Sequence, residues 1–158
     1  MHNTVVIGPF LNMPAPGFTI RDHQHHSQTL GDVMGKHGLL LGFIGDVWQP
    51  ASVRRILWLQ RHAGAFMRSG VNLALLICDQ PHMLYGFRVS SPIPLEFPLL
   101  ADVNHEVHKL YNMDLLSGLV LIDSDRMVRA KWLVPDERVW PQIGELLDAV
   151  QSIAEPVP

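Results

Sequence analysis

The chain has 158 residues, 47% of them hydrophobic, and a mean hydropathy of +0.14, which is enough apolar material for one domain with a continuous core. Its net charge is -3 with a pI near 6.3, and its basic residues are spread along the chain, which argues against nucleic-acid binding. The absence of a signal-peptide pattern, of a membrane-length apolar run and of a cysteine pair predicts a cytoplasmic protein with no membrane partner.

The chain is expected to divide into an N-terminal extension (residues 1–12), a single domain (13–154) and a short tail (155–158). The domain begins with a proline-rich extended segment, residues 13–20. The polar stretch that follows, residues 21–29, is typical of a surface hairpin or loop.

Residues 39–78 predict a strand, a helix and a second strand. The run 39–44 is continuously apolar and too short for a helix, as in a strand buried on both faces. From Pro50 the apolar residues recur every three or four positions up to Ser69, which predicts a helix, and residues 71–78 form a second apolar strand parallel to the first. The predicted inward residues of the helix are Val53, Ile56, Leu57, Ala63, Phe66 and Met67, with the arginines mostly elsewhere.

The rest of the chain predicts a short helix, a hairpin and a closing helix. Residues 79–98 are proline-rich and carry no clear pattern. Asp102 is a plausible cap for a short helix, and residues 119–122 and 128–132 form an antiparallel hairpin with one solvated face. Residues 141–154 form an amphipathic helix over the sheet. The predicted inward stripe of the short helix is Val103, Val107, Leu110 and Tyr111.

Over residues 13–153 the order and spacing of several motifs resemble those of the alkyl hydroperoxide reductase and thiol-specific antioxidant branch of the peroxiredoxins. The motifs are Ala15-Pro16-Gly17-Phe18, the stretches 30–36 and 43–60, Pro98-Leu99-Leu100-Ala101-Asp102 and Leu121-Ile122-Asp123. The resemblance implies a thioredoxin-like α/β fold of three layers, with a central mixed sheet and helices on both faces. It also implies a homodimer and no cofactor.

The residues that carry the family's chemistry are absent. The resembled enzymes place the peroxidatic cysteine directly before the helix proline, where the helix N-terminus lowers the thiol pKa. Here that position is Gln49, Ser52 stands where a second cysteine would be, and Ser117 falls where many members carry an arginine. Asp46 lies near the position of the family's active-site threonine. The resemblance therefore predicts the loss of peroxidase chemistry at this loop.

Three functional hypotheses remain open. In the first, Asp46, Trp48, Gln49, Pro50 and Ser52 hold a small polar or anionic ligand, or the surface around them pairs with a partner. In the second, the protein is a thiol-dependent peroxidase or oxidoreductase whose chemistry has moved to Cys78, although a cysteine ending an apolar strand is usually a buried small hydrophobe. In the third, the chain is a purely structural subunit of a homo-oligomer.

No metal site is predicted. His23 and His25 would share one face of an extended segment, but loop histidines without further ligands are usually solvated. His105 and His108 could hold a metal with Asp102 or Glu106, but Glu106 is expected to point away from the two histidines, and His-Glu-Val-His does not have the spacing of a zinc protease.

Overall fold

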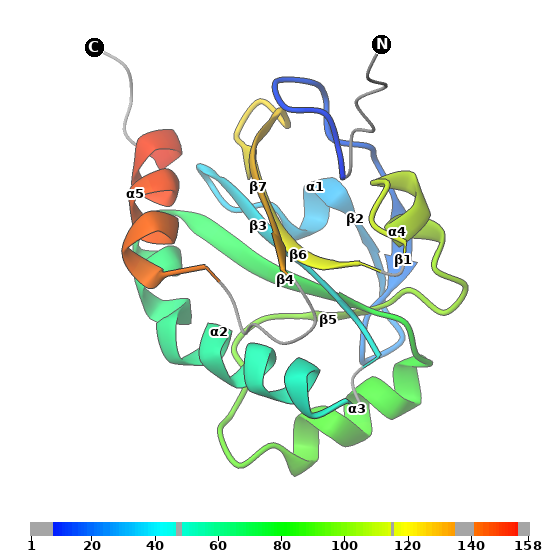
Figure 1. Ribbon diagram of the computed structural model, residues 1–158. Helices are drawn as coiled ribbons and strands as arrows, with labels where there is room; N and C mark the ends of the chain where they lie inside the picture. The colour runs from blue at the N-terminus through cyan, green and yellow to red at the C-terminus, as the bar shows by residue number, and fades with distance from the viewer. Residues whose placement is uncertain (1–7, 47–48, 115, 135–140, 155–158) are drawn as a thin grey trace, which may run out of the picture.

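The computed structural model describes residues 8–46, 49–114, 116–134 and 141–154, and it centres on a five-stranded mixed sheet (Figure 1). The strand order is β5-β4-β3-β6-β7. β3 pairs in parallel with β4 and antiparallel with β6, so the predicted hairpin of β6 and β7 joins the predicted parallel unit along the central strand β3. The five strands are β3 (Gly38–Gly45), β4 (Val71–Ile77), β5 (Leu99–Ala101), β6 (Ser117–Asp123) and β7 (Val128–Val134).

Helices cover both faces of this sheet, which gives three layers and confirms the predicted fold class (Figure 1). One core lies under α2 (Pro50–Arg68), α3 (Pro81–Ser90) and α5 (Ile143–Ala154). The other lies under α1 (Leu30–Val33), α4 (Glu106–Leu110) and the hairpin of β1 (Thr19–Arg21) and β2 (Ser27–Thr29). Among the described residues, no helix has the length and apolar character to cross a membrane.

The central strand, β3, contributes side chains to both cores because successive side chains point to opposite faces of the sheet. Leu40 and Ile44 of β3 point into the first core, whereas Leu41 and Phe43 point into the second. All four are at most 2% exposed. This is why the sequence of β3 is a continuous apolar run rather than an alternating one.

Phe43 anchors the second core, and its removal is expected to destabilise the protein strongly. Its ring centroid lies 5.1 Å from that of His108 and 5.3 Å from that of Tyr111. We expect Phe43→Ala to lower the free energy of unfolding by about 3–5 kcal/mol, measured by urea denaturation. Phe10→Ala, at a side chain that is 62% exposed, is the matched control and is expected to change it by less than about 0.5 kcal/mol. Equal losses for the two variants would contradict this assignment.

Several details of the sequence prediction were wrong or incomplete. Met67 is 43% exposed rather than part of the core, because it lies about 100° around α2 from the buried Phe66. Arg55 is only 3% exposed, although the arginines were placed mostly away from the core side. Val103 is 38% exposed because residues 103 and 104 form a turn and α4 begins only at Glu106, and Leu110, the last residue of α4, is 52% exposed. Elements α1, α3 and β5 were not predicted.

Candidate functional site

A pocket of about 220 Å³ lies where the carboxyl ends of β3 and β4 meet the N-terminus of α2. Parallel strands of an α/β sheet place their carboxyl ends at one edge, and this edge is where such folds bind ligands. The residues that line it are Ile44, Gly45, Asp46, Gln49, Ala51, Ser52, Arg55, Cys78, His105, His108, Leu116 and Ser117.

The N-terminus of α2 forms one part of the pocket wall. Gln49 is the residue before the helix, and its extended backbone lets Pro50 take the first helical position, where no N–H is needed. The Gln49 side chain is exposed and makes no capping hydrogen bond, whereas Ser52 and Arg55, one helical turn apart, are buried. All three residues line the same pocket, Gln49 from the N-cap position and Ser52 and Arg55 from the first two turns of α2.

Of the residues predicted for ligand binding, Asp46, Gln49 and Ser52 line this pocket. Pro50 belongs to the first turn of α2 and does not line it, and Trp48 lies outside the described residues. Ser117, which occupies the family's arginine position, also lines the pocket. Two residues of α2 that the sequence analysis did not propose for the site, Ala51 and Arg55, line the pocket as well.

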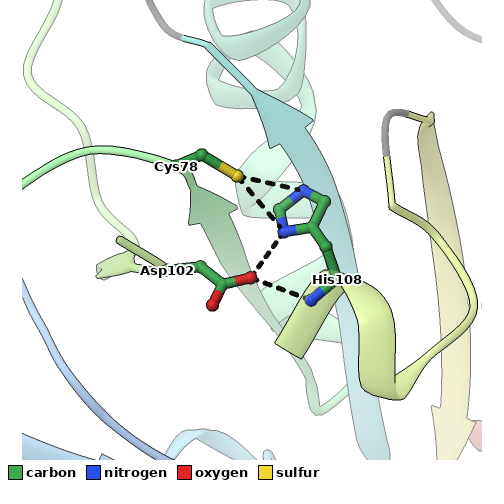
Figure 2. Close-up of side chains that lie close together, drawn as sticks. All are labelled: Cys78, Asp102 and His108. Carbon is green, nitrogen blue, oxygen red and sulfur yellow. Dashed lines mark hydrogen bonds and ion pairs between the residues drawn. The ribbon is translucent and has the colours of Figure 1, made fainter. Parts of the chain in front are cut away.

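The chain's only thiol also faces this pocket. Cys78 follows β4 directly and is partly buried, with its Sγ 3.6 Å from Nδ1 and 3.9 Å from Nε2 of His108 (Figure 2). His108 Nδ1 lies 2.7 Å from Oδ2 of Asp102. An ionised carboxylate only accepts hydrogen bonds. Nδ1 of His108 therefore carries the ring proton and donates a hydrogen bond to Asp102.

The surroundings keep the Cys78 thiol protonated. Burial is the largest cause that raises its pKa from the ordinary 9.0 to about 12, and the nearby carboxylates of Asp102, Asp114, Asp46 and Asp79 contribute to the same rise. This is the opposite of the electropositive setting that makes a cysteine reactive. The thiol is also only partly buried, so it is not the fully buried small hydrophobe that usually ends an apolar strand.

Asp102 organises this part of the site. Its Oδ1 accepts the backbone N–H of Val107 at 3.0 Å, and its Oδ2 accepts that of His108 at 2.8 Å, so it caps α4 from outside the helix. Burial on its own raises the pKa of Asp102, but the hydrogen bonds from His108 and Val107 outweigh it, and the pKa is lowered. The result is a rigid, ionised carboxylate that orients the His108 ring.

The other histidines considered as metal ligands, His105, His23 and His25, do not take part in the hydrogen bond between the His108 ring and Asp102. His105 lines the pocket with Nδ1 3.0 Å from Oδ1 of Asp114, and it is more exposed than His108. His23 accepts the N–H of Leu99 through Nδ1 at 3.3 Å, and His25 sits in a turn with a φ of 68°. Among the described residues, the group that brings three potential metal ligands together is Cys78, Asp102 and His108.

A mixed sheet with helices on both faces, and a functional loop leading from its central strand into a helix, define a thioredoxin-like α/β protein. The sequence profile of the AhpC/TSA family matches residues 11–131, well over half of the chain. The chain therefore belongs to the AhpC/TSA family, as its motifs predicted.

Individual relatives agree with this membership. The chain is 28% identical over 134 residues to a peroxiredoxin of Thermoplasma volcanium, covering 78% of this chain and 64% of that protein. It is 25% identical over 153 residues to peroxiredoxin 2 of Thermoplasma acidophilum, covering 90% and 75%. It thus spans slightly less than two thirds of the first relative. The fold matches the reduced 2-Cys peroxiredoxin of Plasmodium vivax with a TM-score of 0.78 at 21% identity, covering 90% of this chain and 95% of that one.

Proposed function

We propose that this protein is a catalytically degenerate member of the AhpC/TSA family that binds a small polar ligand in the pocket at the N-terminus of α2. The observation that carries the proposal is the residue directly before Pro50, which is Gln49 rather than a cysteine. A carboxamide does not ionise to a nucleophile and cannot be oxidised to a sulfenic acid. The chain's thiol instead follows a neighbouring strand, β4.

The pocket lining supports binding by a small, polar molecule. Ser52 and Arg55 are each at most 4% exposed, and both line the pocket together with the exposed Gln49. Buried polar groups held on a regular helix are well placed to fix the orientation of a ligand. Because the volume is only about 220 Å³, below the range typical of drug-sized ligands, the expected ligand has few non-hydrogen atoms.

The charges around the pocket favour one orientation of a bound ligand. The carboxylates of Asp46, Asp102 and Asp114 act on the end that holds Cys78 and disfavour an anion there. The guanidinium of Arg55 and the backbone N–H groups at the start of α2 favour one. A ligand with a negative group is therefore expected to direct it toward α2.

A second candidate function is a thiol peroxidase that uses Cys78. It is favoured by the 3.9 Å distance between Cys78 Sγ and His108 Nε2, because the unprotonated ring nitrogen of a histidine beside a cysteine can accept its proton. In that reaction the sulfur would attack a peroxide oxygen, giving a sulfenic acid and an alcohol or water. An external thiol would then reduce the sulfenic acid back to the thiol through a mixed disulfide.

Peroxide consumption in the presence of dithiothreitol tests the proposal. We expect the wild-type protein and Cys78→Ser to consume hydrogen peroxide at the same rate as buffer. Gln49→Cys restores a thiol at the helix N-terminus, where its pKa is lowered, and is expected to be alkylated much faster than Cys78 at neutral pH. Gln49→Ser is the control of similar size without sulfur. Wild-type turnover that Cys78→Ser lacks would contradict the proposal and support the second candidate.

A further inference from the structure

Three potential metal ligands meet at one edge of the sheet. The ligand atoms of Cys78, Asp102 and His108 all lie within 4.8 Å of one another (Figure 2). Two of them follow adjacent parallel strands at matching positions, because Ile77 of β4 is in register with Ala101 of β5. The backbone N–H of Asp102 also donates to the carbonyl of Ile77 at 2.8 Å. The spacing of the thiol and the carboxylate is therefore set by the sheet itself.

The third potential ligand, His108, is fixed by its contacts with Phe43 and Asp102. His108 is 1% exposed, its ring is packed edge-on against Phe43 with a centroid distance of 5.1 Å, and its Nδ1 is fixed by Asp102. Asp102 is in turn fixed by two backbone N–H groups of the α4 segment. Ligands held this rigidly lose little conformational entropy when they bind an ion.

One of the ligand-to-ligand distances already equals that of a tetrahedral site, and a second needs a small change. With bonds of about 2.0 Å to nitrogen and oxygen and about 2.3 Å to sulfur, the ligand atoms of a zinc site are about 3.3–3.6 Å apart. Cys78 Sγ and His108 Nδ1 are already separated by 3.6 Å. Nδ1 and Asp102 Oδ2, at 2.7 Å, share a proton, and they would need to part by roughly half an ångström for an ion to replace it.

The charge and softness of the ligands select the kind of ion. Four carboxylates, those of Asp46, Asp79, Asp102 and Asp114, act on Cys78 and favour a cation beside it. They outnumber the guanidinium of Arg55, which also lines the pocket. A thiolate, an imidazole and a carboxylate together are typical ligands of Zn²⁺, whereas Mg²⁺ and Ca²⁺ prefer oxygen alone.

We propose that Cys78, His108 and Asp102 bind a zinc ion whose fourth coordination position opens into the pocket. The inference deepens the proposed function and rests on it, because the ion would form part of the binding pocket. Binding transfers the thiol proton of Cys78 to solvent and forms the Zn–S bond. The proton of His108 moves from Nδ1 to Nε2, so one proton is released for each ion bound. A small polar ligand can then displace water from the fourth position.

The test uses the untagged full chain, freed of metal with a chelator and kept reduced with a phosphine. Titration with Zn²⁺ against a chromophoric chelator is expected to show one tight site per chain. Titration with Co²⁺ is expected to give near-ultraviolet charge-transfer absorption from thiolate to metal. The Co²⁺ spectrum reports the ligand directly in the wild-type protein, so it does not depend on whether a variant folds.

Variants assign the ligands. Cys78→Ser and His108→Ala are expected to weaken zinc binding by more than about 100-fold, and Cys78→Ser is expected to abolish the charge-transfer band. His105→Ala is the matched control, because this histidine lines the same pocket but is outside the three-residue group, and its effect is expected to stay within about threefold. Unchanged zinc binding in Cys78→Ser, or a loss in His105→Ala equal to that in His108→Ala, would overturn the assignment.

The two proposals fail in different ways. If the metal-free protein binds no zinc and consumes no peroxide, the metal site is wrong and the degenerate binding function stands. If the metal-free protein consumes peroxide through Cys78, the degenerate function is wrong whatever the zinc titration shows.

Discussion

In the folded, metal-free protein at pH 8, Cys78 is expected to react with iodoacetamide about 1,000-fold more slowly than in the unfolded chain. The thiolate is the reacting species, and burial together with the nearby carboxylates raises the pKa of Cys78 from 9.0 to about 12. At pH 8 the thiolate fraction then falls from about one in ten to about one in ten thousand. Mass spectrometry of samples quenched at intervals, with and without guanidinium and always with a chelator, gives both rates.

The pH dependence of the same reaction shows the cause. Because deprotonation of a thiol increases with pH, the rate in the folded protein should rise about tenfold per pH unit from pH 7 to pH 10 without levelling off. A rate that levels off between pH 6 and pH 8 would show a thiolate already present at neutral pH. That result would contradict the interpretation of the site and favour the peroxidase at Cys78.

Under the proposed function, the family fold is kept while the family's thiol chemistry at the α2 N-terminus is lost. The loop between β3 and α2 still presents a helix N-terminus to a pocket, but the residue at its tip is Gln49. The chain's thiol, that of Cys78, directly follows the next strand, β4, and the charges of four carboxylates act on it. A peroxidatic cysteine requires the reverse, a positive environment that stabilises the thiolate. This contrast is the reason why we propose that the pocket binds a cation or a polar group and that its thiol does not attack a peroxide.

The parts of the fold that the sequence predicts are those with regular periodicity. The segment from β3 to β4 combines two continuous apolar runs with a helix opened by Pro50, and the structure agrees within a residue or two. In contrast, β5 has only three residues, which is too short for any periodicity to be recognised. Without β5 in the sheet, nothing in the sequence places Asp102 beside Cys78.

The group of three potential metal ligands, Cys78, Asp102 and His108, could not be predicted from the sequence for the same reason. Cys78 and His108 are 30 positions apart, and their contact depends on the register between β4 and β5 and on the turn that precedes α4. His105 and His108 were considered together because of their spacing, but the structure separates their partners into Asp114 and Asp102. The burial of Arg55 had one available signal, its position three residues after Ser52 on the same helix face.

Asp102→Asn is expected to lower the free energy of unfolding of the metal-free protein by about 3 kcal/mol at pH 7. The carboxylate accepts hydrogen bonds from Val107 N, His108 N and His108 Nδ1, all in a site where Asp102 is 2% exposed. An asparagine amide has one oxygen for these donors and turns a donor of its own toward them, so buried N–H groups lose their partner. Urea denaturation of the wild-type protein and the variant at pH 7 gives the difference.

The difference between the two proteins should shrink in acid. Burial raises the pKa of Asp102, but its hydrogen bonds with His108 and Val107 lower it by more, so the folded value lies below the ordinary 3.8. A group with a lowered folded pKa contributes its stability above the unfolded pKa and loses it as the pH falls toward the folded one. The wild-type protein should therefore lose more stability than Asp102→Asn between pH 5 and pH 2. Because the variant has no ionisable group at this position, equal losses in the two proteins would show that the Asp102 carboxylate does not supply this stability.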